Sequence, residues 1–286
     1  MLTRREFAGN AVAGLATMAL APGSFAKKVD RPVGVQLYTV RSVLQNDVPG
    51  TLAAIRKIGY RTVETFVAEY KVTAKDLRQS IADAGLTAPS AHFAYGDFDS
   101  RFDYAKELGV ECVVCSSVPG NVGDSADGFK RAADQYNTWG EKAKTLGLKF
   151  GFHDHDTEFK QFDGVTGFDI LMGRTDPSVV QWQMDCYWVA QAGRDPVALL
   201  RKYGKRIQSL HLKDRLPNAP TSTDTGPGSQ FFTEVGEGTL DWPSIFRLAE
   251  RFNIPNMYVE QDKTEKPPLE CLQISYTNIM KYLSAV

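Results

Sequence analysis

The sequence predicts an α/β fold, a single-domain (β/α)8 TIM barrel. Past residue 30, short apolar runs rich in β-branched residues alternate with segments of helical period. Eight such strand–helix units in about 255 residues match this barrel in number and length. The rival, a doubly wound open sheet, usually has a glycine-rich phosphate loop after its first strand. The stretch "QLYTVRSVLQ" has no glycine, so we prefer the barrel.

The predicted elements follow one another in regular order along the chain. The segment "TAKDLRQSIADAG" predicts a helix with a Thr cap, apolar residues at 77, 81 and 84, and a Gly stop. The segment "DWPSIFRLAERF" predicts another, with a proline in its first turn. The predicted strands cover residues 33–40, 62–66, 88–93, 112–117, 149–155, 179–185, 207–214 and 257–262.

The connection at residues 215–238 is unusually long and rich in Pro, Gly, Ser and Thr. A loop of this length in a compact domain is usually a lid or a disordered insert. Because it follows the seventh predicted strand, we expect it to lie over the C-terminal mouth of the barrel.

Residues 1–26 predict a twin-arginine export signal. Paired arginines in "TRREF" precede a weakly apolar stretch, and "SFA" resembles a cleavage site. The alternatives are an amphipathic N-terminal helix or a lipid anchor, but no cysteine follows the cleavage site, as a lipoprotein would need. We therefore expect a periplasmic protein without stable membrane association once the signal is removed.

Composition excludes several other classes of protein. The net charge is −1 and no run of Lys and Arg occurs, so nucleic acid is not an expected partner. Cys112 and Cys115 have CxxC spacing, but on a strand they point to opposite faces, which favours a structural role. The four cysteines imply no disulfide framework.

Polar side chains gather at the C-terminal ends of the predicted strands, where barrels of this type place their catalytic groups. All four histidines of the chain are among them. One strand histidine is usually a buried core residue, but four at one rim, together with carboxylates, indicate a site. The strand-end residues are Gln36, Tyr38, Glu64, His92, Ser116, His153, His155, Asp185, His211, Lys213, Glu260 and Asp262.

Residues two apart on a strand share a face, so the strand-end residues form inward-facing pairs if those faces point into the barrel. This applies to the pairs 153/155, 211/213 and 260/262. Such a mixed imidazole and carboxylate set suits one divalent ion, namely Mn²⁺, Co²⁺, Zn²⁺ or Mg²⁺. A metal-free general acid–base site is the alternative.

The sequence resembles the sugar phosphate isomerase/epimerase family, the xylose isomerase-like barrels that also include a metal-dependent apurinic endonuclease. The resemblance extends from residue 33 to the C-terminus. Single motifs are weak evidence, but seven in the same order are strong. They are "GVQLYTVR", "GYRTVE", "FHDHDTEF", "MDCYWVAQAGRDP", "HLKD", "VGEGTLDWP" and "YVEQD".

The resemblance implies one metal held by four groups, a Glu, an Asp, a His and a Glu on strands five to eight. In this sequence the Asp, the His and the second Glu correspond to Asp185, His211 and Glu260, whereas His153 stands at the position of the first Glu. Imidazole is a good ligand, so the metal site survives this exchange. In sugar epimerases the two glutamates also form the acid–base pair, so the proton-transfer roles do not carry over unchanged. His155 remains the alternative ligand on strand five.

We assign the remaining roles as a hypothesis about the proton abstraction that such a site would perform. Catalytic candidates are Glu260, Lys213, which would stabilise an oxyanion, and His155 or Glu158 as acid or base. Three alternatives stay open: Lys213 pairs with Asp214 or Glu237, Glu158 caps the next segment, and Trp188 belongs to the core. The expected substrate-binding residues are Gln36, Tyr38, Glu64, His92 and Trp188, with Tyr38 and Trp188 as apolar platforms.

We therefore expect an enzyme that abstracts a proton next to a carbonyl on an unphosphorylated sugar or sugar derivative. The first interpretation is a metal-dependent isomerase or epimerase. The alternatives are a lyase or hydratase that acts on 3-keto-glycosides by elimination, and an inactive sugar-binding barrel. The expected partner is a small sugar or glycoside, and a homo-oligomer is compatible with the sequence.

Overall fold

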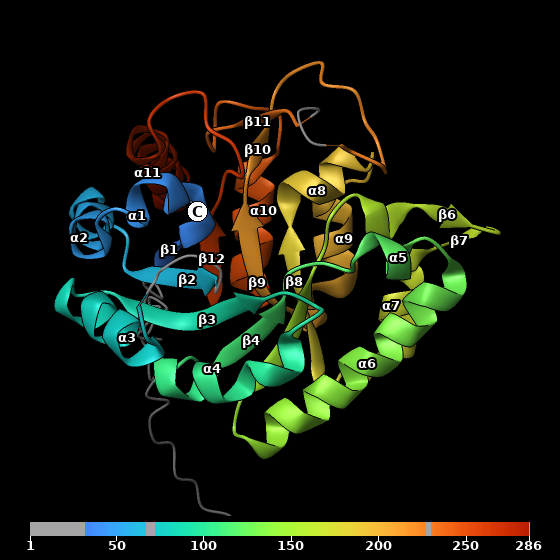
Figure 1. Cartoon of the computed structure of the whole chain (residues 1–286). Coiled ribbons are helices and arrows are strands. Elements are labelled where there is room, and N and C mark those ends of the chain that lie inside the picture. The colour runs from blue at the N-terminus through green and yellow to red at the C-terminus, as the bar shows by residue number, and fades with distance from the viewer. Residues whose placement is uncertain (1–31, 67–71, 227–229, 286) are drawn as a thin grey trace, which may run out of the picture. The chain divides into compact units, whose positions relative to one another are not determined.

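The computed structural model describes residues 32–66, 72–226 and 230–285, and the expected export signal lies outside them. Eight parallel strands close into a barrel in the order β1-β2-β3-β4-β5-β8-β9-β12, which confirms the predicted fold (Figure 1). The strands are β1 (Val33–Gln36), β2 (Thr62–Phe66), β3 (Thr87–Phe93), β4 (Cys112–Cys115), β5 (Lys149–His153), β8 (Val180–Asp185), β9 (Ile207–Leu212) and β12 (Asn256–Val259).

Helices surround the barrel and cover its outer face (Figure 1). The two helices argued above are present: Thr73 caps α3 through its hydroxyl, and Asp241 caps α10, which has a proline in its first turn. The main helices are α2 (Val48–Ile58), α3 (Ala74–Asp83), α4 (Phe102–Leu108), α6 (Ala126–Thr145), α7 (Gly167–Arg174), α9 (Pro196–Tyr203), α10 (Trp242–Arg251) and α11 (Pro268–Ala285). Short helices are α1 (Arg41–Leu44), α5 (Gly120–Gly123), α8 (Cys186–Gln191), η1 (Leu37–Val40), η2 (Phe98–Ser100), η3 (Thr157–Phe159) and η4 (Gly204–Arg206).

Several strands end earlier than predicted. The first strand stops at Gln36, whose side chain accepts a hydrogen bond from the Tyr38 N–H and so starts the 3-10 helix η1. His155, Lys213 and Asp262 also lie beyond the ends of their strands. The two-residue alternation therefore did not apply to them, and their positions depend on loop geometry instead.

The long connection after β9 begins with β10 (Asp214–Arg215) and ends with β11 (Phe232–Thr233). These two short strands pair with each other in antiparallel orientation. Between them the loop, orange at the top of Figure 1, packs against Gln191 of α8, whose side chain donates to the Pro220 carbonyl and the Thr225 hydroxyl. A second hairpin consists of β6 (Gln161–Phe162) and β7 (Val165–Thr166).

The described helices include none that combines the length and apolarity required to span a bilayer. All four cysteines are buried and free.

Candidate metal centre

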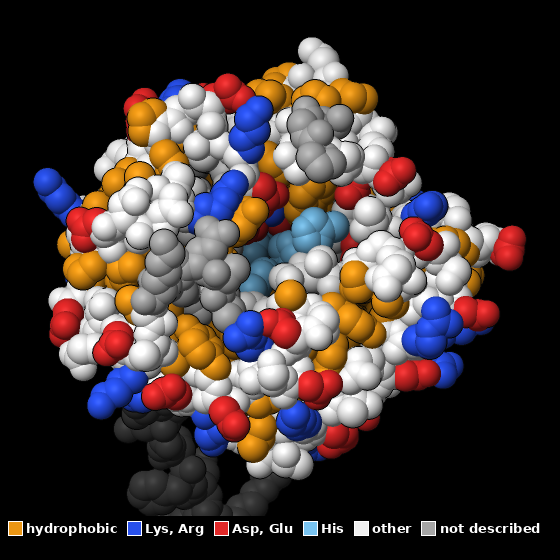
Figure 2. Space-filling view, viewed as in Figure 1, with side chains coloured by type: hydrophobic (Ala, Val, Ile, Leu, Met, Phe, Trp, Pro, Cys, Tyr) orange, Lys and Arg blue, Asp and Glu red, His pale blue; other side chains and the backbone are white. Residues whose placement is uncertain are grey.

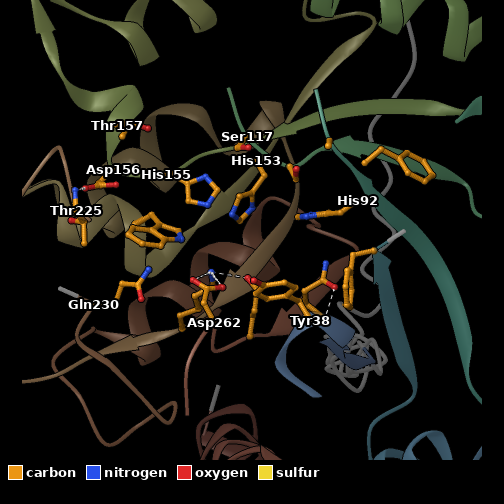
Figure 3. Close-up of a pocket in the computed structure, with 18 of the residues that line it drawn as sticks. Tyr38, His92, Ser117, His153, His155, Asp156, Thr157, Thr225, Gln230 and Asp262 are labelled. Carbon is orange, nitrogen blue, oxygen red and sulfur yellow. Dashed lines mark hydrogen bonds and ion pairs between the residues drawn. The ribbon is translucent and has the colours of Figure 1, made fainter. Parts of the chain in front are cut away.

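A cavity of about 530 Å³ opens at the C-terminal ends of the barrel strands. Figure 2 shows it as a hollow with the histidines, in pale blue, at its floor. Figure 3 shows His92, His153 and His155 gathered on one side of the cavity and Asp262 and Tyr38 on the other. The predicted site residues that line it are Gln36, Tyr38, His92, Ser116, His153, His155, Trp188, Lys213, Glu260 and Asp262.

Four buried side chains converge at the base of this cavity: His153, Asp185, His211 and Glu260. Each offers one ligand atom, and these four atoms lie within 4.8 Å of one another. The strand register produces this convergence, because Asp185 at the end of β8 pairs with His211 of β9. Atoms that bind one ion at about 2.0–2.2 Å are separated by about 3–4.5 Å, so the set has the right size. The predicted ligands are therefore brought together.

The two oxygens of Asp185 have different environments. Oδ1 accepts hydrogen bonds from the backbone N–H groups of Tyr187 and Trp188 and so caps α8. Oδ2 has no hydrogen-bond partner among the described residues, although Lys213 Nζ lies 3.1 Å away. A buried carboxylate oxygen without a hydrogen bond is costly. The Lys213 ammonium offsets part of that cost and a divalent ion bound by Oδ2 would offset more, and the donor set fits such an ion.

His211 is held from behind by Glu64. Its Nε2 donates to Glu64 Oε2 at 2.6 Å, which leaves Nδ1 facing Glu260 Oε2 at 2.9 Å. Burial lowers the pKa of His211, but Glu260 and Glu64 outweigh it and raise the pKa to about 10. A carboxylate that fixes the far nitrogen of an imidazole is the usual outer partner of a metal-binding histidine.

Glu64 does not take the position expected of it. We predicted that it binds substrate hydroxyls, but it is fully buried below the cavity. Besides His211, its carboxylate accepts hydrogen bonds from Gln36, Ser90 and Gln183. Burial raises its pKa, but His92 and His211 outweigh this and hold the pKa well below its ordinary value. Glu64 therefore supports the histidines.

Lys213 is buried among carboxylates. Its Nζ lies 2.7 Å from Glu260 Oε2, 3.1 Å from Asp185 Oδ2 and 3.1 Å from Asp262 Oδ1. Burial lowers its pKa, but these carboxylates outweigh it and hold the pKa well above its ordinary value. The alternative in which Lys213 pairs with Asp214 or Glu237 is therefore wrong.

Asp214 and Glu237 have other partners. Asp214 accepts hydrogen bonds from the Trp242 indole and from backbone N–H groups of the segment after β11, while Glu237 accepts one from Asn278.

The acidic side chains of the motif "FHDHDTEF" mainly accept hydrogen bonds from backbone N–H groups. Asp154 accepts hydrogen bonds from the Trp182 indole and the Asp185 N–H, and Asp156 accepts one from the Thr225 N–H. Glu158 accepts one from the His155 N–H at 2.8 Å.

Glu158 does not line the cavity, and burial raises its pKa to about 7. Of the two acid–base candidates, His155 is the one placed at the cavity.

His155 presents a neutral imidazole to the cavity. Burial and the nearby Lys213 lower its pKa to about 3, and its Nδ1 has no hydrogen-bond partner among the described residues. Its ring lies 5.1 Å from the ring of Trp188. Trp188 lines the cavity although it is only 3% exposed, whereas Tyr38 is 36% exposed at the mouth.

Sequence reasoning missed Gln183, which contacts two of the histidines. Its Oε1 lies 3.0 Å from His153 Nδ1 and 2.5 Å from His92 Nε2. The signal was present: Gln183 lies two residues before Asp185 and therefore on the same face of β8.

Comparison with known proteins gives three results. A family model described as a xylose isomerase-like TIM barrel matches residues 52–271. An inosose dehydratase of Clostridium beijerinckii is 28% identical over 226 residues, which cover 69% of this chain and 75% of the dehydratase. The crystal structure of a sugar phosphate isomerase/epimerase from Parabacteroides distasonis is 26% identical with a TM-score of 0.73, covering 92% of this chain and 98% of that one.

Proposed function

Because the chain belongs to the xylose isomerase-like TIM-barrel family, we propose that it is a metal-dependent carbon–oxygen lyase of the dehydratase type. It would act on an unphosphorylated keto-sugar or a related polyol ketone. The observation that carries the proposal is His153, which takes the place of the second carboxylate of the epimerase pair. Epimerisation uses two proton-transfer groups on opposite faces of the substrate, whereas elimination can use one group that takes a proton from carbon and returns it to the leaving oxygen. The similarity to an inosose dehydratase supports the same reaction class.

The residues that would hold the ion are His153, Asp185, His211 and Glu260. When bound, the ion would act as a Lewis acid on the carbonyl and an adjacent hydroxyl.

Protein side chains would transfer the proton and stabilise the negative charge that develops on the substrate. His155, which lines the cavity, would accept the proton from the carbon next to the carbonyl. As an imidazolium it would then return that proton to the departing hydroxyl, which leaves as water. Lys213 remains charged throughout and stabilises the negative charge that develops on the substrate oxygen.

The cations of the cavity favour an unphosphorylated substrate. Among the described residues that line it, the cationic side chains are Lys213 and Arg101. Lys213 is paired with three carboxylates, and Arg101 is paired with Asp97. Phosphate recognition usually uses an unpaired arginine or lysine, or a helix N-terminus.

A second candidate is an isomerase or epimerase with the same first step. The similarity to a structure named as a sugar phosphate isomerase/epimerase favours it. The two reactions differ only in the fate of the enolate, which is either reprotonated on carbon or loses a β-oxygen.

The deciding experiment incubates the protein, loaded separately with Mn²⁺, Co²⁺, Zn²⁺ or Mg²⁺, with inososes and keto-sugars in D₂O. Nuclear magnetic resonance then follows the carbon next to the carbonyl. An unsaturated ketone supports the lyase, whereas deuterium at that carbon without loss of water supports the isomerase. Neither product with every substrate would leave only a binding function.

We also propose export through the twin-arginine pathway, on the basis of residues 1–26. Replacement of both Arg4 and Arg5 by lysine should retain the protein in the cytoplasm. Cell fractionation would detect this.

A further inference from the structure

The histidines offer two overlapping sets of metal donors. The first is His153, Asp185, His211 and Glu260, and the second is His92, His153 and His211. Both sets are buried and both use His153 and His211. An imidazole nitrogen that carries a proton cannot bind a metal. The hydrogen bonds around the imidazole rings therefore determine which of the two sets can bind an ion.

The orientation of the Gln183 amide is fixed by its neighbours. Its Nε2 lies 2.8 Å from Glu64 Oε1 and 2.9 Å from Ser209 Oγ. Glu64 also accepts hydrogen bonds from Gln36 Nε2 and Ser90 Oγ, so its carboxylate acts here as an acceptor. The opposite amide orientation would place two oxygens against each other. Gln183 Oε1 must therefore face the histidines.

That oxygen fixes the protons on two rings. His153 Nδ1 lies 3.0 Å from Gln183 Oε1, and His92 Nε2 lies 2.5 Å from it. His92 Nε2 is also 3.1 Å from Glu64 Oε2, a second acceptor. Each of these nitrogens therefore carries a proton and offers no lone pair. His153 Nε2 therefore carries no proton, and it lies 3.7 Å from Asp185 Oδ2.

We propose that Gln183 is a positioning residue that selects between the two sets. It leaves His153 Nε2 available to the set with Asp185 and Glu260, and it keeps a proton on His92 Nε2, so that this nitrogen cannot bind a metal. His211 faces the same set through Nδ1, because Glu64 holds the proton on Nε2; the Nδ1 proton, which faces Glu260, is the one that a bound ion would displace. The inference rests on the proposed metal centre but not on the reaction that the centre performs.

The first test replaces Gln183 by leucine and measures Co²⁺ binding by calorimetry and by the visible spectrum of the bound ion. Without the amide, His153 loses the acceptor for its Nδ1 proton. Loss of such an outer partner typically weakens metal affinity by about 10–100-fold. The control is Gln181→Leu, on the same strand, because the Gln181 side chain binds the Pro177 carbonyl instead of a histidine. An unchanged affinity and spectrum in Gln183→Leu would overturn the proposal.

The second test replaces Gln183 by glutamate. A glutamate side chain keeps an oxygen acceptor for His153 Nδ1 and His92 Nε2. We therefore expect Gln183→Glu to bind about one ion, by elemental analysis after dialysis, with an affinity closer to the wild type than that of Gln183→Leu. A Gln183→Glu protein whose affinity is as low as that of Gln183→Leu contradicts the assignment.

A third measurement needs no variant. In the metal-free wild-type protein, long-range ¹H–¹⁵N correlation spectra should show His153 protonated on Nδ1 and His92 on Nε2. Finding His153 protonated on Nε2 alone would refute the proposal even if both Gln183 variants failed to fold. Wild-type protein that binds no divalent ion would overturn the metal centre as well. One bound ion with no effect of either variant would overturn only the role of Gln183.

Discussion

Lys213 Nζ and Glu260 Oε2 lie 2.7 Å apart, and both residues are buried, at 1% and 5% exposure. Glu260 is also one of the four residues whose ligand atoms converge at the base of the cavity. A lysine ammonium and a divalent ion would therefore act on the same carboxylate. The lysine offsets part of the negative charge that Asp185, Glu260 and Asp262 concentrate there.

Replacement of Lys213 by methionine should destabilise the metal-free protein strongly. Removal of one partner from a buried ion pair typically costs about 3–5 kcal/mol, because the remaining charges stay buried without compensation. A divalent ion supplies the missing charge, so Mn²⁺ should restore most of the loss. Urea denaturation with and without Mn²⁺ measures both effects, with the exposed Lys205→Met as the control. If Lys213→Met unfolds at the wild-type urea concentration without metal, the ion pairs contribute little.

Replacement of Asp185 by asparagine should abolish metal binding while the fold is kept. Asparagine can still cap α8 through its oxygen, but its amide would point an N–H₂ group at the metal position. The control is Asp195→Asn, because Asp195 caps α9 in the same way and lies outside the site. Elemental analysis should give about one ion in the wild type and in Asp195→Asn, and almost none in Asp185→Asn or His211→Ala. Full metal content in both site variants would show that the ligand set is wrong.

The barrel and the convergence of the ligands were predictable from the sequence, because both follow from strand periodicity. Asp185 ends β8 and His211 lies within β9, so neighbouring parallel strands place them side by side. His155 and Lys213 lie beyond their strands, and only the loops that follow determine where they point.

The polar layer beneath the site was predicted only in part: Glu64 was expected at the site, as a substrate-binding residue, whereas Ser90, Gln183 and Ser209 were not. Glu64 pairs with Ser90 in register, and Gln183 pairs with Ser209. Their mutual hydrogen bonds, which make their burial tolerable, link strands that are far apart in the sequence.

Glu158 should make stability depend on pH between about pH 4.5 and 7. Burial raises its pKa to about 7, from an ordinary value of 4.5. The folded protein thus holds this proton more tightly than the unfolded chain, and the stabilisation present below pH 4.5 is lost as the pH rises through 7. The shift corresponds to about 3 kcal/mol.

Glu158→Gln removes this titration and can still accept the hydrogen bond from His155. Relative to the wild type, it should gain up to about 3 kcal/mol of stability between pH 5 and pH 8. Urea denaturation at both pH values measures the gain, and the exposed Glu141→Gln should show none. A wild-type-to-variant difference that does not change with pH would mean that Glu158 titrates normally.

The contact between Asp156 and Thr225 should control the long loop after β10. Asp156 Oδ2 accepts the Thr225 N–H at 2.8 Å and so ties the loop to the segment that carries His155. Thr225 and Asp156 both line the cavity, so release of this bond should loosen one wall of the cavity. A hydrogen bond to a charged group contributes about 1.5–3 kcal/mol, so Asp156→Ala should speed exchange of the Thr225 amide by about tenfold or more. Substrate KM should rise more than kcat falls.

Asp224→Ala is the matched control for the loop, because Asp224 is adjacent to Thr225 in sequence but exposed. Gln191 holds the same loop from the other side, so Asp156→Ala combined with Gln191→Ala should release it further than either change alone. Hydrogen exchange measured by mass spectrometry over residues 216–226 distinguishes these cases. Equal exchange in Asp156→Ala and Asp224→Ala would show that the Asp156 carboxylate does not hold the loop, since only one of the two variants removes an acceptor from a loop amide.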